Sequence, residues 1–404
     1  MKAVTYGGGN IGRGFIGALF SASGYQVTFV DVAKPVVETL NREHCYPVRI
    51  LSDKGHEDIL VENVRAVDGN DGDAVAQAIA EADIMATAVG VNILKFIIPN
   101  LVAGIRRRME QGGGPLNILI CENLMDANKV LEKMLKEHLS AREQQWMDEN
   151  IGLVEASIGR MVPVQTEEMK DGDPMRVCVE RYGFLPVDKA AFKGAVPEIL
   201  NMVPFEPFDF YLKRKLYIHN MGHATCAYLG DILGLEYIYQ AIDRDEVYII
   251  VKNAMTESAR ALCKQYGVHL EQILDHVEDL LQRFTNRALG DTCKRVGGDP
   301  TRKLSPADRL IGASKLALSL EMEPAYMAIG AAAGVRRYIA ESADLAQSKE
   351  SALKVLETVS GLKQEEHLTQ LILDFYGRFL AGESLQTIRR AADSLKAAKM
   401  TNVI

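Results

Sequence analysis

The sequence is poor in the features that membrane, secreted or zinc-binding proteins require. No apolar run approaches the ~20 residues of a membrane-spanning helix, and the chain begins in a strand-like segment instead of a basic and then apolar leader. The six cysteines are scattered singly, without a CxxC pair and without zinc-like spacing to histidine. These absences argue against a membrane span, a disulfide framework and a structural zinc. We therefore expect a soluble cytoplasmic protein without a metal site.

A strong charge of either sign is also missing. The net charge of −8 over 404 residues argues against a general affinity for nucleic acids or anionic membranes, so an anionic substrate would need a local basic pocket. The chain has no internal repeat and no low-complexity linker, and it is too long for one ordinary core. We predict two domains, residues 1–185 and 186–404. The sequence leaves the oligomeric state open.

The first half alternates short apolar strands with helices. Because strands that are apolar throughout alternate with helices, we predict a parallel sheet covered on both faces. Residues 46–67 contain short β-like runs that indicate a small insertion, and 175–181 is expected to be an isolated β segment. The expected strands are 2–6, 26–31, 84–89, 117–121 and 153–157, and the expected helices 11–23, 35–43, 73–82, 93–110 and 127–139.

The second half is dominated by long helical patterns. We expect helices over 212–233, 247–266, 270–284, 307–320, 324–341, 351–360 and 365–380. The predicted fold class is therefore α/β, a Rossmann-type parallel sheet followed by a mainly helical domain.

A glycine-rich run follows the first strand and predicts a dinucleotide site. Gly7 allows a tight turn, Gly9 lets the backbone approach a pyrophosphate, and Gly12 lets the next helix pack close to the sheet. The helix that begins near Asn10 and Ile11 would direct its N–H groups and its dipole at the phosphates. Asp31 closes the second strand, where it would bind the adenosine ribose and repel a 2′-phosphate. This arrangement favours NAD over NADP.

The long helix 212–233 carries the best candidate for chemistry. On an ideal α-helix Lys215, Asn220 and His223 fall at about 0°, 140° and 80°, so one broad face can hold all three. Oxidation of an alcohol needs a base for the hydroxyl proton and donors for the developing oxyanion. Lys215 can be that base when burial and a neighbouring cation such as Arg214 favour its neutral form. The spacing alone equally allows a solvated lysine and a core histidine.

Two basic segments compete as an anion site. Residues 286–309 form the first, a glycine-containing loop that is either a substrate pocket or a solvated surface. The second, Arg106–Arg108, lies on a helix of the cofactor domain and is expected to face solvent. The basic residues of the first segment are Arg287, Lys294, Arg295, Arg302, Lys303 and Arg309.

Several stretches resemble the polyol-specific long-chain dehydrogenases, the mannitol dehydrogenase family. The resemblance runs nearly from end to end and includes the family's Lys-x4-Asn-x2-His pattern at Lys215, Asn220 and His223. The other matching stretches are 9–17, 87–90, 121–123, 187–188, 192–194, 214–216, 222–224, 295–296, 302–304 and 308–311.

The resemblance implies a zinc-independent, NAD-dependent reaction between mannitol 1-phosphate and fructose 6-phosphate. It assigns Lys215 as general base and Asn220 and Asn123 as oxyanion donors, with His223 also in the catalytic set. It extends the cofactor site, whose residues are then Gly7, Gly9, Asn10, Ile11, Gly12, Asp31, Val89 and Gly90. The substrate residues that it implies are Arg295, Lys303, Arg302 and Arg160.

One position departs from the family pattern. Where the family reads Val-Asp-Arg-Ile-Val-Pro, this chain has Gly159 in place of the aspartate. A lost hydrogen bond to substrate costs about 1–3 kcal/mol, which is enough to shift substrate preference. A hexuronate reductase and an unphosphorylated polyol dehydrogenase of the same superfamily therefore remain alternatives, as does a non-catalytic NAD-binding sensor.

Overall fold

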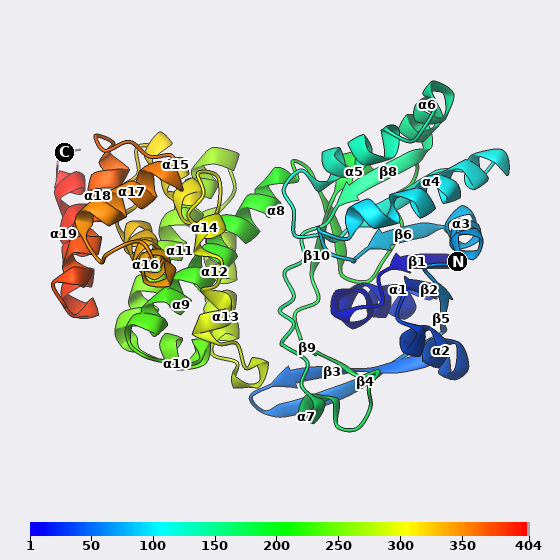
Figure 1. Cartoon of the computed structure of the whole chain (residues 1–404), viewed down its shortest axis with the longest axis horizontal. Helices are drawn as coiled ribbons and strands as arrows, with labels where there is room; N and C mark the ends of the chain where they lie inside the picture. Colours follow the sequence, from blue (N-terminus) through cyan, green and yellow to red (C-terminus); the bar gives the residue numbers. More distant parts are fainter. Residues whose placement is uncertain (402–404) are drawn as a thin grey trace. The chain divides into compact units, whose positions relative to one another are not determined.

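The chain folds into two compact units, Met1–Asp209 and Phe210–Ile404 (Figure 1). The computed structural model describes residues 1–401. Sequence analysis placed the division after residue 185, but the strands β10 (Leu185–Asp188) and β11 (Met202–Phe205) pair with each other inside the first unit. The N–H of Ser157 donates to the carbonyl of Pro186, and this bond attaches β10 to the end of the main sheet.

The first unit contains the predicted parallel sheet. Its six strands follow the order β5-β2-β1-β6-β7-β8, and every neighbouring pair is parallel. The sheet confirms the predicted α/β class, but β5 was assigned to an insertion and is instead the edge strand beside β2. The strands are β1 (Lys2–Tyr6), β2 (Gln26–Asp31), β5 (Val64–Asp68), β6 (Ile84–Thr87), β7 (Leu116–Ile120) and β8 (Ile151–Glu155).

Helices cover both faces of this sheet because successive strand residues point to opposite sides. Ala3 belongs to the core beneath the first helix, whereas Val4 belongs to the core beneath α3 and α4. The first helix, η1 (Gly12–Gly17) with α1 (Ala18–Ala22), shares its face with α2 (Lys34–Glu43). The opposite face is covered by α3 (Gly72–Ala80), α4 (Leu94–Glu110) and α5 (Ala127–Lys136), and α6 (Ala141–Asn150) precedes β8.

A second small sheet confirms one prediction and corrects another. The β-like runs form an antiparallel hairpin, β3 (Cys45–Ser52) and β4 (Gly55–Glu62). The segment that was expected to be isolated, β9 (Val177–Glu180), pairs in parallel with β3, and the helix α7 (Glu167–Lys170) lies just before it. The pairing of β3 with β9 joins segments far apart in the sequence, which strand periodicity alone does not reveal.

The expected solvent exposure of Arg106–Arg108 is wrong for its last residue. Arg108 is buried and donates to the carbonyl oxygens of Ala80 and Ala82 at 2.8 and 2.7 Å. Arg106 instead pairs with Glu143 at 2.6 Å. Arg108 therefore satisfies backbone groups where α3 ends.

The long elements of the second unit are all helices, as predicted. Its central helix α16 is buried on nearly every side, which fits its content of alanine and glycine. The sequence missed the short helices and the last helix. The elements are α8 (Asp209–Lys213), η3 (Arg214–Asn220), α9 (Met221–Ile232), α10 (Ile238–Ile242), α11 (Asp245–Tyr266), α12 (Leu270–Phe284), η4 (Arg287–Leu289), α13 (Cys293–Val296), α14 (Pro300–Lys303), α15 (Ile311–Ser319), α16 (Ala325–Glu341), α17 (Lys349–Thr358), α18 (His367–Leu380) and α19 (Leu385–Thr401). None of the helices among residues 1–401 is long and apolar enough to cross a membrane.

Candidate functional site

The glycine run forms a tight turn between β1 and the first helix. Gly7 has φ +103°, and its N–H donates to the carbonyl of Val30 at 2.8 Å. A Cβ added at Gly12 would lie 1.9 Å from the carbonyl oxygen of Gly7, so the helix packs directly against the turn. At Gly9 no described atom lies within 4 Å of such a Cβ. The turn therefore leaves open space at the one glycine that is expected to face a pyrophosphate.

The first helix begins at this turn and is wound wide. Asn10 is exposed at its start, and Ile11 is half-buried behind it. From Gly12 to Gly17 the backbone follows a π-helix, a winding that recurs at functional sites. The free N–H groups of the first turn lie beside Gly9, where they can receive an anion.

The carboxylate of Asp31 lies against the glycine turn. One oxygen accepts the N–H of Gly8 at 2.7 Å, and the other accepts the N–H of Ala33 at 2.8 Å. These two bonds hold a half-exposed acid where β2 ends. Its place at the carboxyl end of a sheet strand suits a ribose hydroxyl.

A buried arginine supports the same turn and was not identified from the sequence. The Nε of Arg13 donates to the carbonyl of Gly8 at 2.6 Å, and its guanidinium lies 5.7 Å from the ring centre of Tyr46. The hydroxyl of Tyr46 in turn donates to the carbonyl of Arg13 at 2.7 Å. The charge of Arg13 therefore lies behind the turn, where it favours phosphate binding.

A second missed residue, Glu122, holds the loop after β6. Its carboxylate accepts the hydroxyl of Thr87 at 2.7 Å and the N–H of Val89 at 3.1 Å. Burial raises the pKa of Glu122, and these hydrogen bonds oppose that shift. The loop that carries Val89 and Gly90 is thus fixed near Gly7, because a Cβ on Gly7 would lie 2.5 Å from the oxygen of Ala88.

The predicted residues of the first unit therefore gather at one sheet edge. Asn123 is exposed just past the end of β7, next to Glu122. The glycine turn, Asp31 and Gly90 follow the ends of the neighbouring strands β1, β2 and β6. The carboxyl edge of a parallel sheet is where α/β proteins bind their ligands.

The helix that carries Lys215 differs from the ideal α-helix expected from the sequence. Residues 209–232 form one continuous helix, but Arg214–Asn220 is wound as a π-helix. In a π-helix the hydrogen bond joins residue i to i+5 and each turn takes more residues than in an α-helix, so the interval from Lys215 to Asn220 is closer to one full turn. The two side chains therefore project closer together than the predicted ~140° of an α-helix allows.

His223 lies in buried surroundings that keep it neutral. Its ring stacks on Phe284 at 4.7 Å between ring centres, and its Nε2 lies 3.6 Å from a carboxylate oxygen of Asp291. This Nε2 is buried and has no hydrogen-bond partner within the described part of the chain. Burial, together with nearby positive charges, lowers the pKa of His223 to about 3. Those charges belong to Arg295, Arg309, Arg283 and Lys303.

Asp291 links His223 to the predicted substrate arginine. Its other carboxylate oxygen accepts a hydrogen bond from the guanidinium of Arg295. Burial raises the pKa of Asp291, whereas the charge of Arg295 lowers it. Sequence reasoning missed Asp291 because nothing in its local pattern connects it with the helix of His223.

The basic segment divides into buried and exposed members. Lys303 is buried and its ammonium group donates to the carbonyl of Gly298, and burial lowers its pKa to about 8. Arg309 is also buried and donates to Asp308 at 2.7 Å. Arg302 is exposed and pairs with Asp299 at 2.9 Å. Lys303 and Arg309 are therefore not part of a solvated surface loop.

Arg160 lies in the first unit and is held by backbone groups. Its guanidinium donates to the carbonyl of Gly14 at 2.8 Å and to that of Tyr182, and it lies over Phe15 at 4.6 Å. A Cβ added at Gly159 would lie 2.9 Å from the ring of Tyr182. The tyrosine thus occupies the space that the family aspartate would need.

The described residues contain no cluster of metal-ligand side chains. Among residues 1–401, no group of three or more His, Cys, Asp or Glu side chains is arranged to hold a metal ion.

These features define a class of protein. A glycine turn at the carboxyl edge of a parallel sheet, followed by a helical unit with Lys215, Asn220 and His223 on one helix, is the architecture of a Rossmann-type dehydrogenase. The Rossmann domain of mannitol dehydrogenase matches residues 1–201, and its C-terminal domain matches residues 208–376. The chain belongs to the mannitol dehydrogenase family.

Individual relatives agree with this assignment. A mannitol-1-phosphate 5-dehydrogenase of Brevibacillus brevis is 38% identical over 351 residues, which cover 87% of this chain and 90% of the relative. A solved D-sorbitol dehydrogenase superposes with a TM-score of 0.79 at 15% identity, covering 94% of this chain and 93% of its own. The Pseudomonas fluorescens mannitol 2-dehydrogenase, solved with NAD and D-mannitol, gives 0.75 at 14% identity, covering 97% and 94%. At these identities the two solved structures establish the fold.

Proposed function

We propose that this protein is an NAD-dependent dehydrogenase that interconverts mannitol 1-phosphate and fructose 6-phosphate. The observation that carries the proposal is the set of cations around a neutral His223, on the unit that also holds Lys215. The relative named mannitol-1-phosphate 5-dehydrogenase, similar over most of both chains, supports the same substrate. The scattered cysteines favour a cytoplasmic location.

NAD is the cofactor that the first unit fits best. The open space at Gly9 and the helix N-terminus suit the pyrophosphate, and Asp31 suits an unphosphorylated ribose. When bound, NAD accepts a hydride from the alcohol carbon. The family match and the solved relative that contains NAD support this choice.

The side chains of the second unit would move the proton and hold the oxygen. Lys215 takes the hydroxyl proton of the polyol as the hydride leaves. Asn220, five residues further along the same π-wound segment, donates to the same oxygen, and Asn123 of the first unit is proposed as the second donor. The unpartnered Nε2 of neutral His223 is suited to a substrate hydroxyl.

The phosphate would be held by the cations near His223. Arg295 presents a planar guanidinium that can bind an oxyanion through two parallel hydrogen bonds. Lys303 and Arg309 add buried positive charge near His223. Arg302 stays a weaker prediction because it is exposed and paired with Asp299, and Arg160 is left out because backbone carbonyls hold its guanidinium.

A hexuronate reductase is the second candidate. The same cations would bind a carboxylate, and Tyr182 fills the space of the aspartate that family members have at position 159. The sugar contacts of this chain therefore differ from the family pattern at one point.

An assay of purified protein with NADH against four substrates tests the proposal. Fructose 6-phosphate should give the highest kcat/KM, well above fructose, tagaturonate and fructuronate, because only it combines the polyol chain with a phosphate. A preference for either uronate would establish the second candidate. Absence of turnover on all four, with NADH bound, would indicate a non-catalytic NAD-binding protein.

A further inference from the structure

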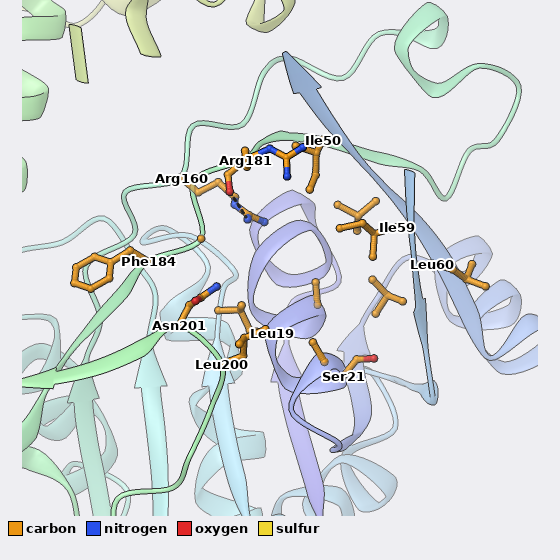
Figure 2. Close-up of a pocket in the computed structure, with 15 residues that line it drawn as sticks. Leu19, Ser21, Ile50, Ile59, Leu60, Arg160, Arg181, Phe184, Leu200 and Asn201 are labelled. Atoms are coloured by element: carbon orange, nitrogen blue, oxygen red, sulfur yellow. Dashed lines mark hydrogen bonds between the residues drawn. The ribbon is translucent and has the colours of Figure 1, made fainter. Parts of the chain in front are cut away.

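A cavity of about 400 Å³ opens in the first unit between the end of the first helix and the β3–β4 hairpin (Figure 2). No residue of the glycine turn, 7–12, belongs to its described lining. The walls are mostly aliphatic and aromatic, with Leu19 and Ala22 on the helix, Ile50 and Ile59 on the hairpin, and Phe184 and Leu200 opposite. Its volume falls within the range of small-molecule sites.

Two large aliphatic side chains beside this cavity are exposed. Ile59 and Leu200 keep 43% and 53% of their surface accessible, whereas Leu60 points away from the cavity on the other side of β4 (Figure 2). Grouped apolar exposure around a concave surface is a feature of binding sites, because water contact with it is unfavourable. The cavity therefore favours a ligand with an apolar body.

One end of the cavity is positively charged. Figure 2 shows the guanidinium groups of Arg160 and Arg181 next to each other, near Ile50. No carboxylate belongs to the described lining, and the carboxylate of Glu57 meets Arg181 at 2.6 Å on the exposed rim. Such an exposed ion pair contributes little, so an incoming anion can replace it. The charge complements an anionic head group.

We propose that this cavity binds an amphipathic anion, a carboxylate with an aliphatic chain of medium length. The carboxylate would bind the guanidinium of Arg181, with the positive charge of Arg160, which donates to backbone carbonyls, beside it. The chain would extend between Ala22 and the hairpin. The site is separate from the dinucleotide edge, so the anion and NADH bind together. The link to the cofactor helix is the hydrogen bond from Arg160 to the carbonyl of Gly14.

Titration calorimetry with octanoate tests the site on the full chain saturated with NADH. One octanoate should bind per chain, while octanol and acetate, which lack either the charge or the chain, should bind at least tenfold more weakly. Arg181→Gln should weaken octanoate binding about tenfold. Ala22→Phe should abolish it by filling the cavity, because Ala22 is exposed on its wall.

Matched controls separate the site from general effects. Arg42→Gln removes an exposed arginine that also pairs with a glutamate, and Ala141→Phe adds a ring at an exposed alanine elsewhere. Both should bind octanoate as the wild type does, and all variants should retain NADH binding. Octanoate that competes with NADH, binds no more tightly than octanol, or ignores both cavity variants would overturn the proposal, as would the absence of saturable binding.

Discussion

At the scale of single residues, Asp291 connects His223 and Arg295, which the sequence pattern assigns to separate catalytic and substrate-binding roles. It contacts His223 with one oxygen and Arg295 with the other. A substrate phosphate that binds Arg295 must therefore compete with Asp291 or share the guanidinium with it. Because Asp291 is buried, its hold on Arg295 orients that side chain more firmly than a surface pair would.

Replacing Arg295 tests the anion assignment. Arg295→Ala should raise KM for fructose 6-phosphate about ten- to a hundredfold, since a charge-assisted hydrogen bond contributes roughly 1.5–3 kcal/mol. KM for fructose should change far less. The control Arg287→Ala removes an exposed arginine of the same segment, paired with Asp243 at 3.6 Å, and should leave both values unchanged. Equal losses on both sugars would assign Arg295 to the sugar chain.

Replacing Lys215 tests the proposed base. Lys215→Ala should lower kcat about 10²–10⁴-fold, because a general base acts in the chemical step, while the affinity for NADH stays near that of wild type. Lys213 is the control, since its ammonium donates to the hydroxyl of Tyr266 at 2.8 Å. Lys213→Ala should keep its turnover. Steady-state kinetics across pH decide the matter, and a Lys215 variant with normal turnover would remove this residue from the mechanism.

Replacing Asp31 tests cofactor choice. Asp31→Ala should narrow the preference for NADH over NADPH, because it removes the charge that repels a 2′-phosphate. It should also lower stability slightly, since Gly8 and Ala33 lose their acceptor. Asp71→Ala, which removes a comparable cap from α3, should leave the preference unchanged. A wild type that uses both cofactors equally would contradict this role for Asp31.

At the scale of elements, substitutions of two glycines in one turn should have different effects, one on NADH affinity and the other on thermal stability. Gly9→Ala should fold normally and lose NADH affinity, because its Cβ enters open space where the pyrophosphate is proposed to lie. Gly12→Ala should lower the thermal midpoint markedly, because its Cβ would collide with the carbonyl of Gly7. Thermal unfolding and NADH titration of both variants check this. A Gly9 variant with wild-type affinity would place the pyrophosphate elsewhere.

Elements with local signals could be predicted from the sequence. The spans of β1, β2 and α12 match the expected ranges, because apolar periodicity and the flanking turns define them. The pairings of β5 and β9 could not, because they depend on strands distant in sequence. Candidate residues in recognised motifs could be proposed from the sequence for the same reason, because the spacing within a motif is a local signal. Glu122 and Asp291 were missed because their importance comes from contacts across the fold.

At the scale of the whole molecule, Glu257 should make stability depend on pH. It is buried on α11, accepts the N–H groups of Tyr326 and Met327 at the start of α16, and lies 3.3 Å from Lys396. Burial raises the pKa of Glu257 from 4.5 to about 7. The folded protein therefore keeps a proton that the unfolded chain releases above pH ~4.5, so its unfolding free energy falls as pH rises through about 7.

The expected loss from Glu257 is on the order of 3 kcal/mol, at 1.36 kcal/mol for each unit of pKa. Urea unfolding of wild type and Glu257→Gln between pH 5 and 8 measures it. The difference between the two proteins should change across this range, because glutamine does not titrate. Parallel pH curves would show that Glu257 has the same pKa folded and unfolded.

The wide turn of η3 has a consequence for transplanting this chemistry. Lys215 and Asn220 are five positions apart, and that interval is closer to one full turn where the backbone is π-wound than where it is α-helical. On a regular α-helical scaffold the same five-residue interval would separate the two side chains by about 140° around the axis. A designer who places the lysine, asparagine and histidine on such a scaffold must shorten the interval from lysine to asparagine to four residues. The alternative is to copy the π-wound backbone together with its sequence.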